Sequence, residues 1–320
     1  MRVGVVGAGL AGLGAARTLV AAGHEVVVVE KSRGLGGRLA SRRVGALVMD
    51  HGSPALSAPP GSALREAIDA LADPDVGEGP EGLTHPAGAT RIPKALAEGL
   101  DVRRGVRLAA LREHSSGLEL GDEQGNTHGV VDAVVLTAPA PQAADLLARS
   151  PEAGARVDAL RGLGYAPAVI VLLGVAPIAG AWDVVRPEGG PVAEVRRETG
   201  KGRPAADGAE GLVARLGDAA SRELLDASDE AVLDAALPAL ADAVGPAAAH
   251  PPWVQVKRWR FAVPRGHLDD AVVNPPGARV VVAGDTVTGA AFGGSDHHRV
   301  YASGVAAALR VAGAAPVAAR

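Results

Sequence analysis

Three glycines near the start of the chain have the spacing that a nucleotide pyrophosphate requires. Gly7, Gly9 and Gly12 follow the apolar segment 1–6. Gly7 allows a sharp turn, Gly9 lets the backbone approach the phosphates, and Gly12 permits the following helix to pack close to the strand. The free N–H groups and the macrodipole at the start of that helix favour negative charge. The pattern predicts a site for a dinucleotide.

A carboxylate follows at the place where such a site needs one. The apolar run 25–29 ends on Glu30, and an acid at the end of the second strand can accept the hydroxyls of an adenosine ribose. The glycines alone could arise by chance in a chain with 43 of them, so the strand, helix and acid around them carry the prediction. Lys31 and Arg33 suggest a 2′-phosphate pocket, but Glu30 would repel that phosphate.

The segment after Glu30 is basic and rich in glycine, with Gly36-Gly37-Arg38 at its centre. A planar guanidinium can hold two phosphate oxygens, and glycines allow close approach. The segment resembles the G-G-R segment of the flavin amine oxidase superfamily, most closely of its renalase-like branch. The resemblance implies FAD as the cofactor and places Arg38 at its pyrophosphate. A solvated basic loop is the alternative.

The resemblance continues near the C-terminus. The apolar run 279–283 leads into Gly284-Asp285, and in the family this aspartate binds a ribitol hydroxyl of FAD. An ordinary turn at the end of a strand is the alternative. Residues 301–307 resemble a family helix aimed at the flavin, with Ser295 as its expected N-cap. The residues expected to contact FAD are Gly7, Gly9, Ala11, Gly12, Glu30, Lys31, Gly37, Arg38, Ser53, Leu108, Asp285 and Ser303.

An interior segment, 257–264, resembles the family's W-R-Y-A-x-P strand, which lines the catalytic chamber. We therefore expect Trp259, Arg260 and Tyr301 to line the substrate site, with none of them essential. Aromatic faces can form a dry box that aligns a substrate C–H bond, although filling a domain interface is an equal alternative. The aromatic residues near the C-terminus are Trp253, Trp259, Phe261, Phe292 and Tyr301.

Two motifs depart from the family pattern. The turn D-x-G-A-Q is replaced by residues 50–54, which end in Pro54, and proline has neither an N–H nor a side-chain amide. A glutamate and two small residues are replaced by residues 298–300. These departures leave the contact to the flavin pyrimidine and the retained activity open.

The histidines are weaker candidates for a catalytic or ligand-binding role. His297 and His298 are adjacent, so on a helix they point about 100° apart, and we expect no metal site. One of the two could act as a base or contact the flavin. We expect His51 and His85 to lie at the surface or behind the residues that touch substrate.

Composition limits the class of protein. A chain of 320 residues with 48% apolar content exceeds one compact domain. A net charge of −4 with interspersed signs leaves no basic stripe for nucleic acid. The absence of cysteine excludes disulfides and thiol chemistry, so redox chemistry must come from a cofactor. Since the nucleotide motif starts at residue 2 and no long apolar span follows, we expect a cytoplasmic protein without membrane contact.

The spacing of apolar residues predicts where the strands and helices lie. Strands are expected at 1–6, 25–29, 44–50, 102–111, 118–120, 130–136, 168–173, 212–216, 254–259 and 278–285. Helices are expected at 63–71, 92–98, 142–147, 230–244 and 296–312, besides the one after Gly9. The segment 200–208 is expected to be an exposed loop.

The length and these elements predict two domains. The resemblance implies an α/β fold with a Rossmann-type FAD-binding domain and a second substrate domain built on a mostly antiparallel sheet. The FAD-binding domain is expected to comprise residues 1–56, 86–148 and 277–320, and the substrate domain residues 57–85 and 149–276. The resemblance implies a flavin at their junction.

The resemblance also implies an FAD-dependent oxidoreductase of the oxidase type. It would take a hydride onto flavin N5 from a carbon next to nitrogen, in a dihydropyridine or an amine, with O2 as acceptor. An FAD-dependent desaturase of a larger metabolite and a non-catalytic nucleotide-binding module are the alternatives. The expected partner is a small-molecule substrate, and the expected state is a monomer or a homodimer.

Overall fold

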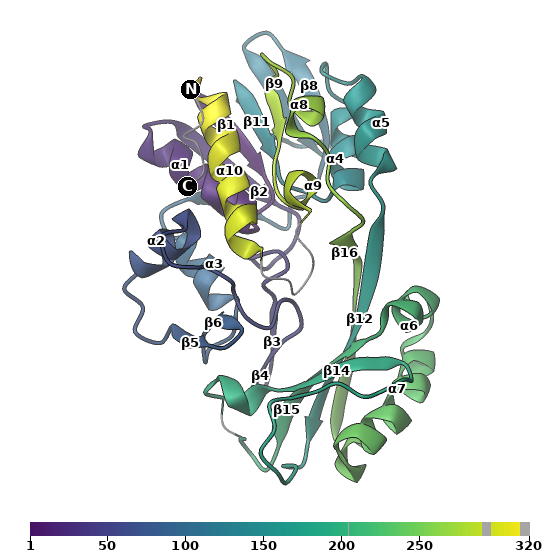
Figure 1. The fold of residues 1–320 in the computed structure, drawn as a ribbon. Coiled ribbons are helices and arrows are strands. Elements are labelled where there is room, and N and C mark those ends of the chain that lie inside the picture. Colours follow the sequence, from purple (N-terminus) through teal and green to yellow (C-terminus); the bar gives the residue numbers. More distant parts are fainter. Residues whose placement is uncertain (204, 290–295, 314–320) are drawn as a thin grey trace.

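A parallel sheet of five strands forms the centre of one half of the molecule (Figure 1). The computed structural model describes residues 1–203, 205–289 and 296–313. The strand order is β17–β11–β1–β2–β7, and every neighbouring pair is parallel. The turn after the central strand therefore opens at the carboxyl edge, where sheets of this kind hold nucleotides. In that order the strands span Val280–Val282, Ala133–Leu136, Arg2–Val6, Glu25–Glu30 and Asp101–Arg104.

Both faces of this sheet are covered. Val26 and Val28 pack on one face with α1 (Leu10–Ala21) and α10 (His297–Val311). Val27 and Val29 pack on the other face. Because successive residues of a strand point to opposite faces, burial on both sides accounts for the unbroken valine runs. The second face is covered by β8 (Leu108–His114), β9 (Gly117–Asp122), β10 (Thr127–Val131), α4 (Ala140–Leu147), α5 (Ala155–Gly162) and α8 (Asp270–Val273).

Two of the expected strands are each divided. The segment 102–111 forms β7 and β8, because Gly105 has φ +73° and turns the chain between them. The segment 130–136 forms β10 and β11, separated at Asp132, whose carboxylate accepts the Arg2 N–H at 2.7 Å. The two expectations were wrong because β7 and β11 belong to the parallel sheet, whereas β8 and β10 belong to a small antiparallel sheet.

An antiparallel sheet forms the other half, in the order β13–β14–β15–β12–β16. The fold class predicted from the sequence is confirmed by this second sheet beside the Rossmann sheet. In Figure 1 the long strands β12 and β16 run from one half into the other. In sheet order the strands span Val184–Val185, Val192–Arg197, Glu210–Leu216, Tyr165–Val175 and Trp253–Pro264, and the covering helices are α6 (Asp218–Glu223), α7 (Asp229–Val244) and the short η2 (Pro246–Ala248).

A hairpin from the first half reaches the open face of the antiparallel sheet. It consists of β3 (Ser41–Val44) and β4 (Leu47–Asp50), which replace the single strand expected at 44–50. Gly45, with φ +56°, makes the turn. Met49 is fully buried against Ala168 and Ile170 of β12. The hairpin therefore fixes the position of the residues that follow it, 51–54.

The segment 57–85 holds α2 (Ala63–Asp69), β5 (Gly77–Gly79) and β6 (Gly82–Thr84), followed by α3 (Arg91–Leu96). Leu64 and Ile68 of α2 share an apolar cluster with Leu13 of α1 and Tyr301 of α10. The apolar contacts of this segment thus lie with the nucleotide-binding half. The domain boundaries drawn from the sequence stay a prediction.

The expectation of an exposed loop at 200–208 is confirmed in part: residues 202, 205, 207 and 208 are exposed, but Arg203 is buried. The short helix η1 (Glu198–Lys201) leads into Arg203, which is 7% exposed and pairs with Asp50 and Glu198. Buried carboxylates require cationic partners, and this segment supplies them. Pro204 lies outside the described residues. Across the described part of the chain, no helix combines the length and the apolar character that crossing a membrane requires.

Candidate active site

The glycine turn has the geometry that its sequence predicts. Gly7 has φ +106° and donates its N–H to Val29 O at 2.9 Å. A Cβ on Gly12 would lie 1.9 Å from Gly7 O, so only glycine fits where the helix meets the turn. Gly9 is the N-cap of α1 and offers no side chain. Its backbone and the first N–H groups of α1 are therefore open to a phosphate.

Glu30 ends β2 beside this turn. Its carboxylate accepts the Ala8 N–H at 2.8 Å and the Ser32 N–H at 2.7 Å, which fixes its orientation. Next to it, Lys31 Nζ donates to Gln142 Oε1 at 2.8 Å. The backbone bonds leave lone pairs of the carboxylate for a ribose hydroxyl.

Arg38 and Asp285 meet across the middle of the cavity, with Nη1 and Oδ2 3.2 Å apart. Burial raises the pKa of Asp285, and the charge of Arg38 opposes that rise. Among the described residues, Oδ2 of Asp285 accepts no hydrogen bond of good geometry, although it is buried. Its pairing with Arg38 is therefore electrostatic, which leaves lone pairs of the carboxylate for a ligand group such as a hydroxyl.

Several predicted contacts support this pair from behind. Ser53 is buried and donates its N–H to Arg38 O at 2.8 Å. Ser303 Oγ accepts the Gly284 N–H at 2.9 Å and so holds the turn before Asp285. Gly12 and Ser303 do not border the cavity, so we infer that they hold neighbouring backbone in place and do not touch the ligand. The predicted contacts that do border it are Gly7, Gly9, Ala11, Glu30, Lys31, Gly37, Arg38, Ser53, Leu108 and Asp285.

The wall at the far end of the cavity is a stacked pair. The rings of His51 and Trp259 lie 5.6 Å apart at 27°, and Trp259 Nε1 donates to His51 O at 2.8 Å. Burial, followed by the nearby charge of Lys257, lowers the pKa of His51 to about 4. The imidazole is therefore neutral at pH 7. His51 lines the cavity itself, which corrects the expectation that it lies behind the site.

The other residues considered for the substrate site lie in different surroundings. Arg260 borders the cavity, but its guanidinium pairs with Asp226 at the surface. Tyr301 is 4% exposed and packs against Gly14 of α1, so its placement corrects the expectation that it lines the substrate site. From the sequence we expect Tyr301 at the substrate site, because nothing in the sequence shows that this ring packs against α1. Trp253 joins the apolar cluster around Met49, and Phe261 borders the cavity.

His297 lines the cavity, and its Nδ1 accepts the Ser57 N–H at 3.1 Å. Burial, followed by the charge of Arg38, lowers its pKa to about 4. A neutral histidine at the start of α10 can contact a ligand without bringing charge. The expected N-cap Ser295 and the aromatic Phe292 lie outside the described residues.

No pattern in the sequence indicated the buried charge cluster that lies behind the hairpin. Arg203 Nη2 donates to Asp50 Oδ2 at 2.7 Å, and Lys201 Nζ donates to Glu198 Oε1 at 2.9 Å. The charges of Lys201 and Arg203 lower the pKa of Asp50 against the effect of burial, whereas burial raises that of Glu198. Because Asp50 directly precedes His51, these buried ion pairs also fix the position of His51 in the stacked wall.

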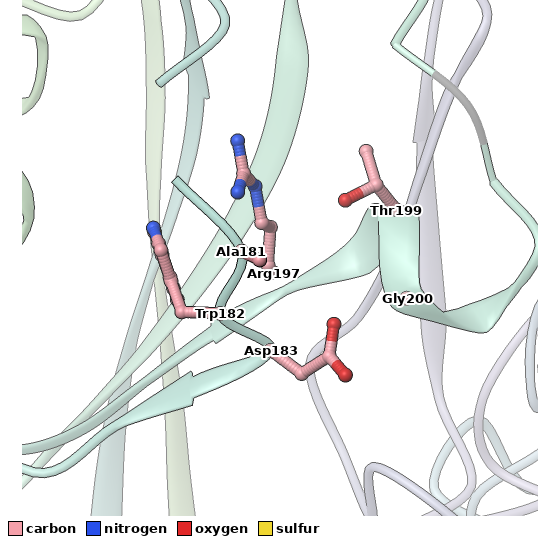
Figure 2. Close-up of a pocket in the computed structure, with 6 residues that line it drawn as sticks. All are labelled: Ala181, Trp182, Asp183, Arg197, Thr199 and Gly200. Atoms are coloured by element: carbon pink, nitrogen blue, oxygen red, sulfur yellow. The ribbon is translucent and has the colours of Figure 1, made fainter. Parts of the chain in front are cut away.

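Two further groups lie apart from this cavity. His85 is buried rather than at the surface, and with Asp73 and Asp75 it could approach a cation. Asp73 already faces His85 at 3.3 Å and Arg91 at 3.6 Å, so we assign no ligand there. A small open pocket, whose lining is drawn in Figure 2, has Arg197 over the ring of Trp182 at 5.0 Å. Glu210 neutralises that arginine.

The described residues fit FAD. One cavity of about 1030 Å³ joins the glycine turn, Arg38 and Asp285 to the wall of His51 and Trp259. This volume is at the upper end of small-molecule sites, about 300–1,000 Å³. The donors suit a pyrophosphate, and the buried carboxylate of Asp285, which faces Arg38, suits a polyol. Fold and site together define an oxidoreductase with a dinucleotide cofactor.

Comparison with known proteins gives the family. The chain belongs to the flavin containing amine oxidoreductases, whose model matches residues 61–312. A model of the NAD(P)-binding Rossmann-like domain matches residues 5–71. The cofactor is therefore FAD, as the sequence predicted. The renalase-like branch has no such support.

Solved structures share the fold. Putrescine oxidase bound to putrescine has a TM-score of 0.70 at 16% identity, over 98% of this chain and 99% of that one. A putative protoporphyrinogen oxidase from Exiguobacterium has a TM-score of 0.69 at 16% identity, over 95% and 97%. Cyclohexylamine oxidase from Brevibacterium oxydans has 0.67 at 16%, over 98% of both.

Proposed function

We propose that this flavin oxidoreductase oxidises a small dihydropyridine or amine in the manner of the renalase-like branch, with O2 as the final acceptor. When bound, FAD supplies the hydride acceptor, N5, for a C–H bond next to nitrogen. The observation that carries the proposal is the continuous cavity, since one space joins the phosphate turn to the stacked pair of His51 and Trp259.

The residues have separate roles in this proposal. Arg38 neutralises the pyrophosphate, and Asp285 and Glu30 accept hydroxyls of the cofactor. Trp259 presents a flat apolar face that orients the substrate ring, and the ring of His51, which also lines the cavity, stacks with it. The lone pair of the substrate nitrogen drives hydride departure, so the site needs little acid–base machinery. The low pKa of about 4 keeps His51 uncharged and suits it to an apolar wall.

Anaerobic mixing of the FAD-loaded protein tests the proposal. Isomers of reduced nicotinamide dinucleotide and simple amines are offered as reductants, and the loss of flavin absorbance is followed. We expect rapid bleaching with at least one of them, and peroxide on admission of air. Trp259→Phe should slow bleaching about tenfold, because a looser wall misaligns the C–H bond. Trp182→Phe, in the other pocket, should leave the rate unchanged. Bleaching by none of these compounds contradicts the proposal.

A desaturase of a larger metabolite is the second candidate. Its support is the size of the cavity, about 1030 Å³, together with the shared fold of the putative protoporphyrinogen oxidase. Bleaching only by a bulky reduced ring system would favour it. The third alternative, a non-catalytic module, is set aside because the chain belongs to a family of oxidoreductases.

A further inference from the structure

One face of α4 borders the cavity. Gln142, Asp145 and Leu146 all line it, and their spacing of three and four residues puts them on the same side of the helix. Leu146 shares an apolar cluster with Leu108 of β8, which borders the cavity as well. This end of the cavity therefore has apolar walls from two elements, with a side-chain amide beside them.

These walls lie next to Glu30, at the end of β2. The Glu30 carbonyl accepts the Val106 N–H at 3.0 Å, which brings the segment before β8 to this point. Lys31, the next residue, donates from Nζ to Gln142 Oε1 at 2.8 Å and so joins the end of β2 to α4. Both Lys31 and Val106 border the cavity. Because we assign the ribose hydroxyls of the cofactor to Glu30, we expect the attached base between the apolar walls.

Lys31 fixes the orientation of the Gln142 amide. An ammonium group offers donors and no acceptor, so the atom that faces Lys31 Nζ is the amide oxygen. The amide nitrogen, Nε2, then carries its two N–H groups on the other branch. Within residues 1–203, 205–289 and 296–313, no group accepts a hydrogen bond from Nε2. Since Gln142 is half-buried and borders the cavity, both donors are available to a ligand there.

Adenosine needs the groups that this end of the cavity offers. Its ribose hydroxyls can donate to a carboxylate, and Glu30 provides one. The ring nitrogens of adenine are acceptors and require donors, and its flat faces require apolar cover. The Glu30 carboxylate has no donor to offer, whereas Gln142 Nε2 has two. The amide therefore complements the base, and the carboxylate complements the sugar.

We propose that Gln142 selects adenine at this site: its amide donates to a ring nitrogen of the base, and Lys31 is the positioning residue that holds the amide in this orientation. The inference concerns the cofactor alone and goes beyond the proposed reaction. FAD contains adenosine and FMN does not, so the contact makes the protein selective for FAD over FMN.

Fluorescence titration of the apoprotein with FAD and with FMN tests the proposal. Gln142→Leu removes both donors without adding charge, so the Kd for FAD should rise about tenfold. Gln142→Glu, which keeps the shape of the side chain and also lacks the donors, should show a similar loss. The Kd for FMN should stay the same in both variants, because FMN has no base to meet residue 142.

Gln124→Leu, in the exposed turn after β9, is the matched control and should leave both Kd values unchanged. The thermal midpoint shows that each variant is folded. An unchanged Kd for FAD in either variant of Gln142, or an equal rise for FMN, overturns the proposal. Because the titration needs no turnover, failure of the proposed reaction is recorded separately.

Variants of Lys31 test the positioning role. Lys31→Met removes the donor that holds the amide, so the Kd for FAD should rise about threefold, and Lys31→Arg, which keeps a donor, should retain the original affinity. In the double variant Lys31→Met/Gln142→Leu, the loss should equal that of Gln142→Leu alone, because Lys31 acts through Gln142. Additive losses would show that Lys31 does not act through Gln142 and would overturn its positioning role.

Discussion

Arg38 and Asp285 are the residues on which the proposed cofactor site depends most directly. They come from distant parts of the chain, yet Nη1 and Oδ2 lie 3.2 Å apart. Arg38 Nη1 also donates to Ala262 O at 2.9 Å, which orients the guanidinium. The arginine thus stabilises a buried carboxylate and is placed to meet a phosphate.

Arg38→Ala should weaken FAD binding at least tenfold, because a charge-assisted hydrogen bond of about 1.5–3 kcal/mol is lost. The measurement is fluorescence titration of the apoprotein with FAD. Arg33→Ala is the matched control, since Arg33 is exposed in the same segment. Equal affinity in both variants would remove Arg38 from the site.

The two cavity histidines predict how stability depends on pH. The pKa of His51 and of His297 falls from 6.5 to about 4 on folding. The unfolded chain therefore binds protons that the folded protein does not, and stability decreases as the pH falls from 6.5 toward 4.

At pH 5 unfolding should take up about one proton for each of these histidines. The double variant His51→Asn/His297→Asn should lose this uptake, as measured by the pH dependence of the denaturation midpoint. At pH 8 the uptake from both should vanish, which provides the internal control. A pH slope in the double variant as steep as that of the unaltered protein would contradict the assignment.

At the scale of elements, the contact between α1 and α10 sets the geometry of the phosphate turn. Two glycines allow the helices to touch, one on each helix. A Cβ on Gly14 would lie 2.7 Å from Tyr301 O, and one on Gly304 would lie 1.9 Å from Ala11 O. Because α10 also carries Ser303, which holds Gly284, the contact links both ends of the chain at the site.

Gly304→Ala should destabilise the protein by about 2 kcal/mol or more, because the helices cannot separate without disturbing the core. Thermal unfolding measures the loss, and FAD affinity should fall with it. Gly162→Ala is the control, since this helical glycine has open space around it and no positive φ. A thermal midpoint for Gly304→Ala equal to that of Gly162→Ala would refute the close contact.

At the scale of the whole molecule, two kinds of connection join the halves. The long strands β12 and β16 run through both (Figure 1). The hairpin from the nucleotide-binding half is held to the antiparallel sheet by Met49 and by the buried charges of Asp50, Glu198, Lys201 and Arg203. The wall that follows the hairpin is therefore positioned by both halves.

Arg203→Met should cost about 3–5 kcal/mol, because it leaves buried carboxylates without their cation. Asp226→Ala, which breaks the exposed pair with Arg260, should cost at most about 1 kcal/mol. Chemical denaturation of both variants provides the comparison. Equal losses would show that the buried cluster is not what joins the halves.

Much of the fold was predictable because it depends on local patterns. The glycine turn, the valine runs of the parallel sheet and the helix at 296–312 each have a period or a steric requirement that the sequence displays. The turn after β1 and Glu30 were predicted in this way, and the resemblance added Arg38 and Asp285.

The sequence by itself determined the glycine turn and indicated a dinucleotide as its ligand, because backbone conformation and charge at this turn follow from residue type. Only the tertiary structure decided which distant side chains meet. It placed Tyr301 in the core, His51 in the wall and Arg203 among buried carboxylates. Such contacts depend on the packing of segments far apart in the chain, and no local period encodes them.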